Sequence, residues 1–178
     1  MSLPDYAELH CLSNFSFLRG ASHPEELVEQ AAAQGYAALA LTDECSLAGV
    51  VRAHRAALAV DGEKGAETPP RLIVGSEMTT ADGLKLVFLA QNRDGYGNLS
   101  ALITLARRRA AKGAYTLQRH DLNAVSPSGA VPDCLVLWVP GGRPDADDGR
   151  WLAGQFPGRC WIAVELHAGP DDAARLAE

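Results

Sequence analysis

The chain has 178 residues, of which 47% are apolar, and a formal net charge of −6. This length permits a real hydrophobic core and favours a single compact domain. The negative charge argues against a surface that grips nucleic acid by itself, because phosphate binding depends on clustered Lys and Arg. The four cysteines form no CxxC pair, and the sequence shows neither a signal peptide nor a long apolar span. These features predict a reducing, cytoplasmic location and no membrane partner.

Short apolar runs alternate with longer helical patterns, which is typical of β-α units in a mostly parallel sheet or barrel. In the first half we expect a strand at 6–10, a helix from the capping box at 22–25 to Gly35, a strand at 36–42, a helix at 47–58 and an exposed loop at 59–70. In the second half we expect strands at 71–77 and 84–91 around an Asp82-Gly83 turn, a helix at 99–111, strands at 134–139 and 161–165, loops at 126–132 and 141–149, and a helix after Pro170.

Polar side chains follow several of the expected strands. They are His10, the Asp43-Glu44 pair, Glu77, and Glu165 with His167. In parallel β/α architectures, ligands gather where strands end, and these residue types suit zinc, manganese or iron. The spacing is consistent with a metal site for phosphate-ester chemistry. Spacing alone fits hydrogen-bonded residues at the rim of a barrel better than it fits a metal site.

Four stretches, in order along the chain, resemble the motifs of polymerase-and-histidinol-phosphatase (PHP) domains. Residues 8–20 (ELHCLSNFSFLRG) resemble the opening motif, residues 39–49 (LALTDECSLAG) the second, and residues 73–77 (IVGSE) the third. Residues 86–99 (LVFLAQNRDGYGNL) are similar to a stretch found in the alpha subunits of bacterial C-family DNA polymerases. That last likeness favours a polymerase domain over a free-standing phosphatase.

The resemblance implies an α/β fold, namely a distorted (β/α)₇ barrel that is incomplete because the fragment ends before the last units. Residues 1–178 would then be a C-terminally truncated PHP domain of a larger DNA-directed DNA polymerase. The first two motifs look like those of the error-prone branch, which implies roles in translesion synthesis, DNA repair and DNA replication. The implied partners are DNA, bound through polymerase domains outside these residues, and accessory mutagenesis proteins or polymerase subunits. Magnesium would serve the parent polymerase.

The sequence departs from the family at several positions where an intact site binds two or three metal ions. The implied ligands that remain are His10, Glu77 and His167, with Glu44 in place of a histidine, and the positions that have lost their ligand are Leu12, Arg19 and Lys85. Leucine cannot bind a cation, and two basic side chains repel dications in a low-dielectric pocket. We therefore expect no catalytic residue and no cofactor in this chain. A residual site for one Zn or Mn at His10, Glu44, Glu77 and His167 stays open.

Arg19 offers an alternative to the metal, because a planar guanidinium matches a carboxylate bidentately. We expect it to form an ion pair with Glu44 or Glu77. The leading hypothesis is thus a structural, catalytically silent module. The competing hypotheses are an active metal-dependent phosphoesterase, either histidinol-phosphatase-like or a proofreading-type exonuclease, and a docking module for partner proteins. The basic run at 107–109 is expected on a solvated helix end, or on a surface that faces the polymerase or nucleic acid.

Overall fold

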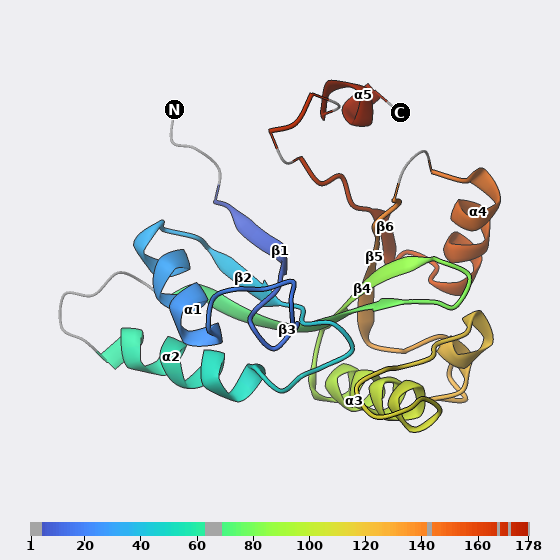
Figure 1. The fold of residues 1–178 in the computed structure, drawn as a ribbon, viewed down its shortest axis with the longest axis horizontal. Helices are drawn as coiled ribbons and strands as arrows, with labels where there is room; N and C mark the ends of the chain where they lie inside the picture. Colours follow the sequence, from blue (N-terminus) through green and yellow to red (C-terminus); the bar gives the residue numbers. More distant parts are fainter. Residues whose placement is uncertain (1–4, 63–68, 142–143, 167, 171, 178) are drawn as a thin grey trace. The chain divides into compact units, whose positions relative to one another are not determined.

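The computed structural model describes residues 5–62, 69–141, 144–166, 168–170 and 172–177. It divides into two compact units, Met1–Glu77 and Met78–Glu178, which Figure 1 shows in colours that follow the chain. Strands and helices alternate in both units, which confirms the predicted α/β class. That the whole chain is one domain stays a prediction. Within the described residues, no helix has the length and apolar character needed to cross a membrane.

The first unit contains a parallel sheet with two helices. Its elements are β1 (Ala7–Cys11), α1 (Pro24–Ala33), β2 (Ala38–Leu41), α2 (Val50–Gly62) and β3 (Arg71–Thr79), of which β3 continues into the second unit. Strand β2 lies between β1 and β3 and is parallel to both, with Ala7 opposite Ala38 and Leu41 opposite Val74. All four residues of β2 are buried, as expected for the middle strand of a parallel sheet.

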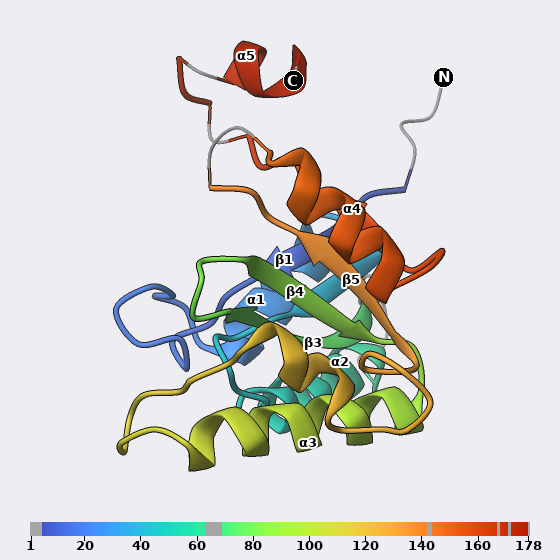
Figure 2. The same ribbon diagram turned by 90° about the vertical axis from the view of Figure 1, so that its right-hand side faces the viewer.

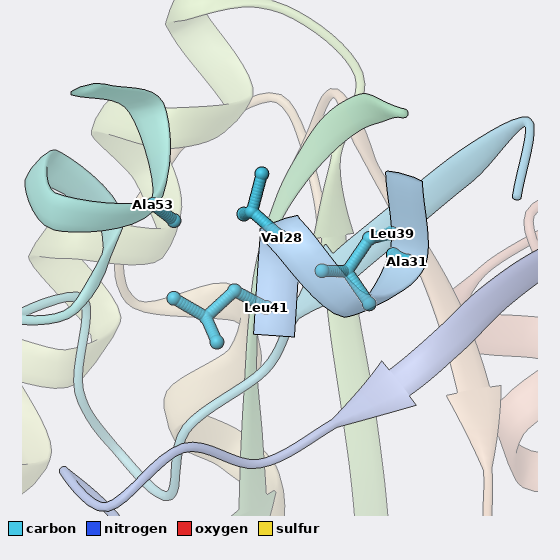
Figure 3. Close-up of a cluster of buried hydrophobic side chains, with 5 residues drawn as sticks. All are labelled: Val28, Ala31, Leu39, Leu41 and Ala53. Atoms are coloured by element: carbon cyan, nitrogen blue, oxygen red, sulfur yellow. The ribbon is translucent and has the colours of Figure 1, made fainter. Parts of the chain in front are cut away.

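The core of the first unit lies between β2 and its two helices. Figure 3 shows Val28 and Ala31 from α1, Leu39 and Leu41 from β2, and Ala53 from α2. Each of these side chains is less than 4% exposed. Burial of such apolar groups is the main favourable term in folding. Here it anchors β2 against α1 and α2, and so fixes the position from which the residues after β2 extend.

The helix boundaries in this unit differ from those predicted. The cap of α1 lies one residue later than the predicted box, because the His23 N–H donates to the Glu26 carboxylate at 2.7 Å. Helix α2 begins at Val50 instead of residue 47 and continues to Gly62. The prediction of a loop was therefore wrong for residues 59–62, whereas residues 63–68 lie outside the described residues.

The second unit combines antiparallel and parallel strand pairs. Its elements are β4 (Lys85–Ala90), α3 (Arg93–Arg108), the 3₁₀ helix η1 (Arg119–Asn123), β5 (Cys134–Trp138), α4 (Ala146–Gln155), β6 (Cys160–Ile162) and α5 (Asp172–Ala177). Strand β5 is antiparallel to β4 and parallel to β6. The predicted Asp82-Gly83 turn is confirmed, since the Thr80 N–H donates to the Leu84 carbonyl at 2.9 Å.

Two helices of this unit differ from the sequence prediction: α3 begins earlier than expected, and α4 was not predicted. Helix α3 begins six residues before position 99, because the Asn92 side chain caps it by accepting from the Gly95 N–H at 2.9 Å. Helix α4 falls partly on the predicted loop at 141–149, which was therefore wrong for residues 146–149. The Asp145 carboxylate caps α4 by accepting from the N–H groups of Asp147 and Asp148.

The basic run at the end of α3 makes contacts within its own unit. Arg107 lies over the ring of Tyr115 at 5.5 Å, and Arg109 pairs with the buried carboxylate of Asp121 at 2.6 Å. Arg108 contributes to a shallow hollow along the outside of α3. Two of the three arginines thus contact the segment that follows the helix. These contacts favour a role at the helix end over a surface that faces the polymerase or nucleic acid.

The loop before β5 is fixed by Arg159 and by the start of α3. The Arg159 guanidinium donates to the carbonyls of Ala130, Val131 and Cys134 at 3.0, 3.1 and 2.6 Å. A Cβ at Gly95 would lie 2.1 Å from the Asp133 carbonyl oxygen, so only glycine permits this approach.

Candidate functional site

A buried aspartate at the end of β2 organises the loop between β1 and α1. Asp43 is 1% exposed. Its Oδ1 accepts from the Ser13 N–H at 2.8 Å and from Ser16 Oγ at 2.7 Å, and its Oδ2 accepts from Ser13 Oγ at 2.7 Å. Three donors around one buried carboxylate satisfy its hydrogen-bonding capacity and fix the loop on the strand.

The loop then turns back toward the ends of the strands. Ser16 Oγ accepts from the Glu44 N–H at 2.9 Å, and the Ser16 carbonyl accepts from the Arg19 N–H at the same distance. Gly20 follows, and a Cβ there would lie 2.0 Å from the Ser13 carbonyl oxygen. The serine-rich turn and this glycine together bring the side chain of Arg19 to two carboxylates, that of Glu44, which follows β2, and that of Glu77, which lies in β3.

Arg19 forms ion pairs with both Glu77 and Glu44. Its two terminal nitrogens each donate to one carboxylate oxygen of Glu77, Nη1 to Oε1 and Nη2 to Oε2, the second at 3.0 Å. Nη1 also donates to Glu44 Oε2 at 3.1 Å. The ion pair predicted from the sequence is confirmed, and it includes both of the alternative partners instead of one.

His10 completes this group of side chains, which we call the ion cluster (His10, Arg19, Glu44 and Glu77). His10 Nε2 lies 2.9 Å from Glu77 Oε2. With Glu77 ionised beside Arg19, Nε2 is the donor of this hydrogen bond, because an ionised carboxylate only accepts. A protonated ring nitrogen has no lone pair to offer a cation. In this arrangement Nε2 of His10 supports Glu77, and it would have to give up this hydrogen bond in order to bind a cation.

The side chains of the ion cluster differ in how deeply they are buried. The Glu77 side chain is 1% exposed, whereas those of Arg19 and Glu44 are each 34% exposed. A buried carboxylate needs a partner charge, and Arg19 provides it. The hydrogen bonds to Glu77 are the largest effect that raises the pKa of Arg19 above its ordinary value, and those to Glu44 add to it.

Nearby, burial raises the pKa of Cys11 to about 11, which keeps this thiol protonated and unreactive at neutral pH.

Several described side chains at this site lack, or have already engaged, the donor atoms that a multinuclear metal centre requires. Leu12 has no donor atom, and the guanidinium of Arg19 occupies both oxygens of Glu77. Among the described residues, no group of three or more His, Cys, Asp or Glu side chains is arranged to hold a metal ion. Lys85 begins β4 in the second unit, and His167 lies outside the described residues. The residual metal site therefore stays a prediction.

The sequence interpretation named His10, Glu44, Glu77 and Arg19 but gave no role to Ser13 and Ser16. Both serines are buried and both bind Asp43. The spacing S-x-x-S in a turn that precedes a capped helix was a usable signal, because small hydroxyl residues in turns commonly satisfy buried polar groups.

Comparison with known proteins places this arrangement in a family. The model of the PHP domain matches residues 8–129, which include the whole ion cluster and the capped start of α3. The chain belongs to the PHP domain family. Two proteins named error-prone DNA polymerase are similar to this PHP chain over 99% of its length. The one from Dechloromonas aromatica is 75% identical and the one from an Azoarcus species is 58% identical.

This PHP chain covers only a small part of those relatives. It spans 16% of the Dechloromonas protein and 18% of the Azoarcus protein. The sequence likeness therefore shows the family of this segment, while the activity of a longer protein is a matter for proposal.

Solved structures confirm the predicted PHP-type fold. A protein from Bifidobacterium adolescentis, for which a metal-dependent phosphoesterase activity has been suggested, superposes with a TM-score of 0.67 at 16% identity. The match covers 98% of this PHP chain and 82% of that protein. An amidohydrolase from Chromobacterium violaceum gives a TM-score of 0.59, also at 16% identity, over 96% of this chain and 81% of its own. At this identity the likeness is one of fold.

Proposed function

We propose that this chain is the PHP module of an error-prone DNA polymerase that acts in translesion synthesis and DNA repair, and that the module itself is structural. The likeness over 99% of the chain to proteins named error-prone DNA polymerase supports the first part. DNA would be bound by the polymerase domains of the longer protein, with magnesium serving their chemistry and accessory mutagenesis proteins or polymerase subunits as partners. The net charge of −6 agrees with a module that does not grip DNA by itself. The setting would be the cytoplasm.

The observation that carries the structural role is the guanidinium of Arg19 on the carboxylates of Glu77 and Glu44. A cation fixed about 3 Å from both carboxylates supplies the charge that metal ions supply in an intact centre, and it repels a dication that approaches the same oxygens. The ion cluster then acts as an internal substitute for metal. It holds the loop after β1 against the sheet without any ligand from solution.

A metal titration tests the structural role. The chain is stripped with chelator and titrated with Zn²⁺ and with Mn²⁺ by calorimetry, and we expect no stoichiometric binding of two or more ions. The matched variant is Leu12→His/Arg19→Asp/Glu44→His, which returns the implied family ligands to three positions and should gain affinity for both ions. Binding of two or more ions by the unaltered chain, with anomalous scattering beside His10, would refute the proposal.

The competing hypothesis is an active metal-dependent phosphoesterase, and it makes the opposite prediction for catalysis. It requires hydrolysis of a generic phosphomonoester that chelator abolishes and His10→Ala removes. We expect no turnover in metal-supplemented buffer, because His10 Nε2 donates to Glu77 and Arg19 occupies the carboxylates. Metal-dependent turnover at the same rate in the unaltered chain and in the ligand-restored variant would favour the phosphoesterase.

The polymerase role is tested on the longer protein that carries this chain. Primer extension on an undamaged template and across a lesion, with and without Mg²⁺, should show templated incorporation that needs the metal. A purified protein that incorporates no nucleotide on either template would overturn this part of the proposal while leaving the ion cluster untouched.

A further inference from the structure

Two neighbouring apolar side chains lie almost fully in solvent at the turn between β1 and α1. Phe17 is 83% exposed and Leu18 is 89% exposed. We call this pair the apolar tip. In Figure 2 the blue trace of this turn extends beyond the end of β1. Single exposed apolar residues are common on protein surfaces, but two adjacent large ones on a projecting turn are typical of an interaction site.

The apolar tip sits on rigid backbone. Ser16, directly before it, is bound to Asp43 through its hydroxyl, and Arg19, directly after it, is bound to Glu77 and Glu44. The Arg19 N–H and the Gly20 N–H both donate to the Ser16 carbonyl, at 2.9 and 3.0 Å. A contact made by such a preorganised turn loses little conformational freedom on binding, so most of the burial of the tip adds to affinity.

Leu18 adopts a backbone conformation that favours glycine or asparagine. Its φ is +63°, in the left-handed region, where a leucine is strained. A large apolar residue at such a position, pointing into solvent, stabilises nothing in its own unit. Strain of this kind persists where a function requires it. Its exposure and its backbone strain are together consistent with a role for this side chain outside the unit.

We propose that the apolar tip inserts into an apolar pocket on the polymerase portion of the same longer polypeptide, and that the ion cluster serves to aim it. This inference rests on the proposed polymerase role of the parent protein. Two aromatic or aliphatic side chains bury on the order of 300 Å², well below the roughly 800 Å² per partner that a stable separate complex needs. A tethered partner avoids that requirement, because its effective concentration is high. This chain spans 16% of a relative, so most of the surface of a protein of that kind lies outside it.

The test is photo-crosslinking within the full-length protein. The variant Phe17→p-benzoylphenylalanine is irradiated and the crosslinked peptides are mapped by mass spectrometry. We expect a crosslink to a peptide of the same polypeptide beyond residue 178, with a yield that does not depend on protein concentration. The matched control is Val51→p-benzoylphenylalanine on α2, which is 67% exposed and should give no such crosslink.

A second measurement uses ordinary substitutions at exposed positions that leave the core intact. In the full-length protein, Phe17→Ser/Leu18→Ser should speed the tryptic release of this module about tenfold, since docking then loses one or two buried apolar groups. The control pair Val51→Ser/Leu58→Ser, also exposed, should leave the rate unchanged.

The outcomes of these experiments distinguish failure of the docking inference from failure of the polymerase role. A crosslink to a second copy, seen as a dimer whose yield rises with concentration, would overturn it, as would a crosslink to a different protein or none at all. The same preparation is assayed for primer extension. If nucleotide is incorporated but the tip does not crosslink within the chain, the docking inference alone has failed; if no nucleotide is incorporated, the polymerase role has failed.

Discussion

In the first unit, the loop after β1 surrounds the carboxylate of Asp43, whereas in the second unit the loop before β5 surrounds the guanidinium of Arg159. Both loops are irregular and each is fixed by one charged side chain with three or more hydrogen bonds. The carboxylate receives two of its bonds from side-chain hydroxyls, while the guanidinium donates to backbone carbonyls. The loop around Asp43 therefore depends on particular residues, because serine side chains supply two of its donors. The loop around Arg159 does not, because every residue supplies a backbone carbonyl.

The two loops also differ in what they present. Ala130 and Val131, beside Arg159, are buried, so that loop contributes to the core of its unit. Phe17 and Leu18, beside the ion cluster, point into solvent. Two loops that are fixed in a similar way therefore differ in what they expose: one packs into the core of its unit, and the other carries two exposed apolar side chains.

The largest effect is expected when the acceptor of the first loop is removed. Asp43→Ala leaves the Ser13 N–H and two buried hydroxyls without their acceptor, and should lower the free energy of unfolding by about 4 kcal/mol. Asp43→Asn keeps the shape and one acceptor oxygen, and should cost about half as much. Urea denaturation of the chain measures both. Equal costs for the two variants would show that the ionised carboxylate itself, and neither the size of the side chain nor one remaining acceptor oxygen, determines stability at this position.

A somewhat smaller loss is expected when the donor of the second loop is removed. Arg159→Ala frees three carbonyls and the contact of the guanidinium with the ring of Phe156, and should cost about 3 kcal/mol. Because Arg159 is only partly buried, whereas Asp43 is 1% exposed, water replaces part of the loss. Arg159→Lys, which keeps the charge but not the fork, serves as the control in the same urea experiment. A lysine variant as stable as the wild type would show that the charge, and not the three hydrogen bonds of the guanidinium, stabilises the second loop.

Disruption of the ion cluster is expected to cost less than the loss of either loop centre. Arg19→Ala leaves the buried Glu77 without its bidentate partner, but the guanidinium is one-third exposed, so solvent screening reduces the cost to about 2 kcal/mol. Glu77→Gln in the same background should recover part of that loss, because a neutral amide needs no counter-charge. A double-mutant cycle on the free energy of unfolding measures the coupling. Additive costs would mean that the two side chains do not interact.

The smallest effect is expected at an exposed pair that fixes no loop. Hydrogen bonds from Thr80, and then from Arg119, hold the pKa of Asp82 below its ordinary value. A lowered pKa contributes stability that is present above the ordinary pKa and is lost as pH falls through the lowered one. Asp82→Asn should therefore cost no more than about 0.5 kcal/mol at pH 7, since the side chain is half exposed, and nothing at low pH. Unfolding midpoints between pH 2 and pH 7 test this, and a cost that persists at pH 2 would exclude an electrostatic origin.

The sequence predicted the regular elements and the charged part of the site better than the loops. Buried runs such as β2 and the ion pair of Arg19 follow from apolar patterning and from charge complementarity, and both were predicted. The early start of α3 and the whole of α4 were missed, because both helices begin at Asn or Asp caps that read equally well as turn residues. The contacts of Arg159 had no signal in the sequence, since its partners are backbone carbonyls.

The sharing of Glu77 between Arg19 and His10 limits how this site can change over time. Loss of Arg19 alone strands a buried charge, and an acid in its place would set three carboxylates together, a gathering that only a bound dication would make tolerable. A protein in that state would depend on metal supply in order to fold. In the proposed structural role, the module is free of that dependence. A return that begins at Arg19 would be difficult, because removal of the guanidinium first leaves the buried Glu77 without this partner.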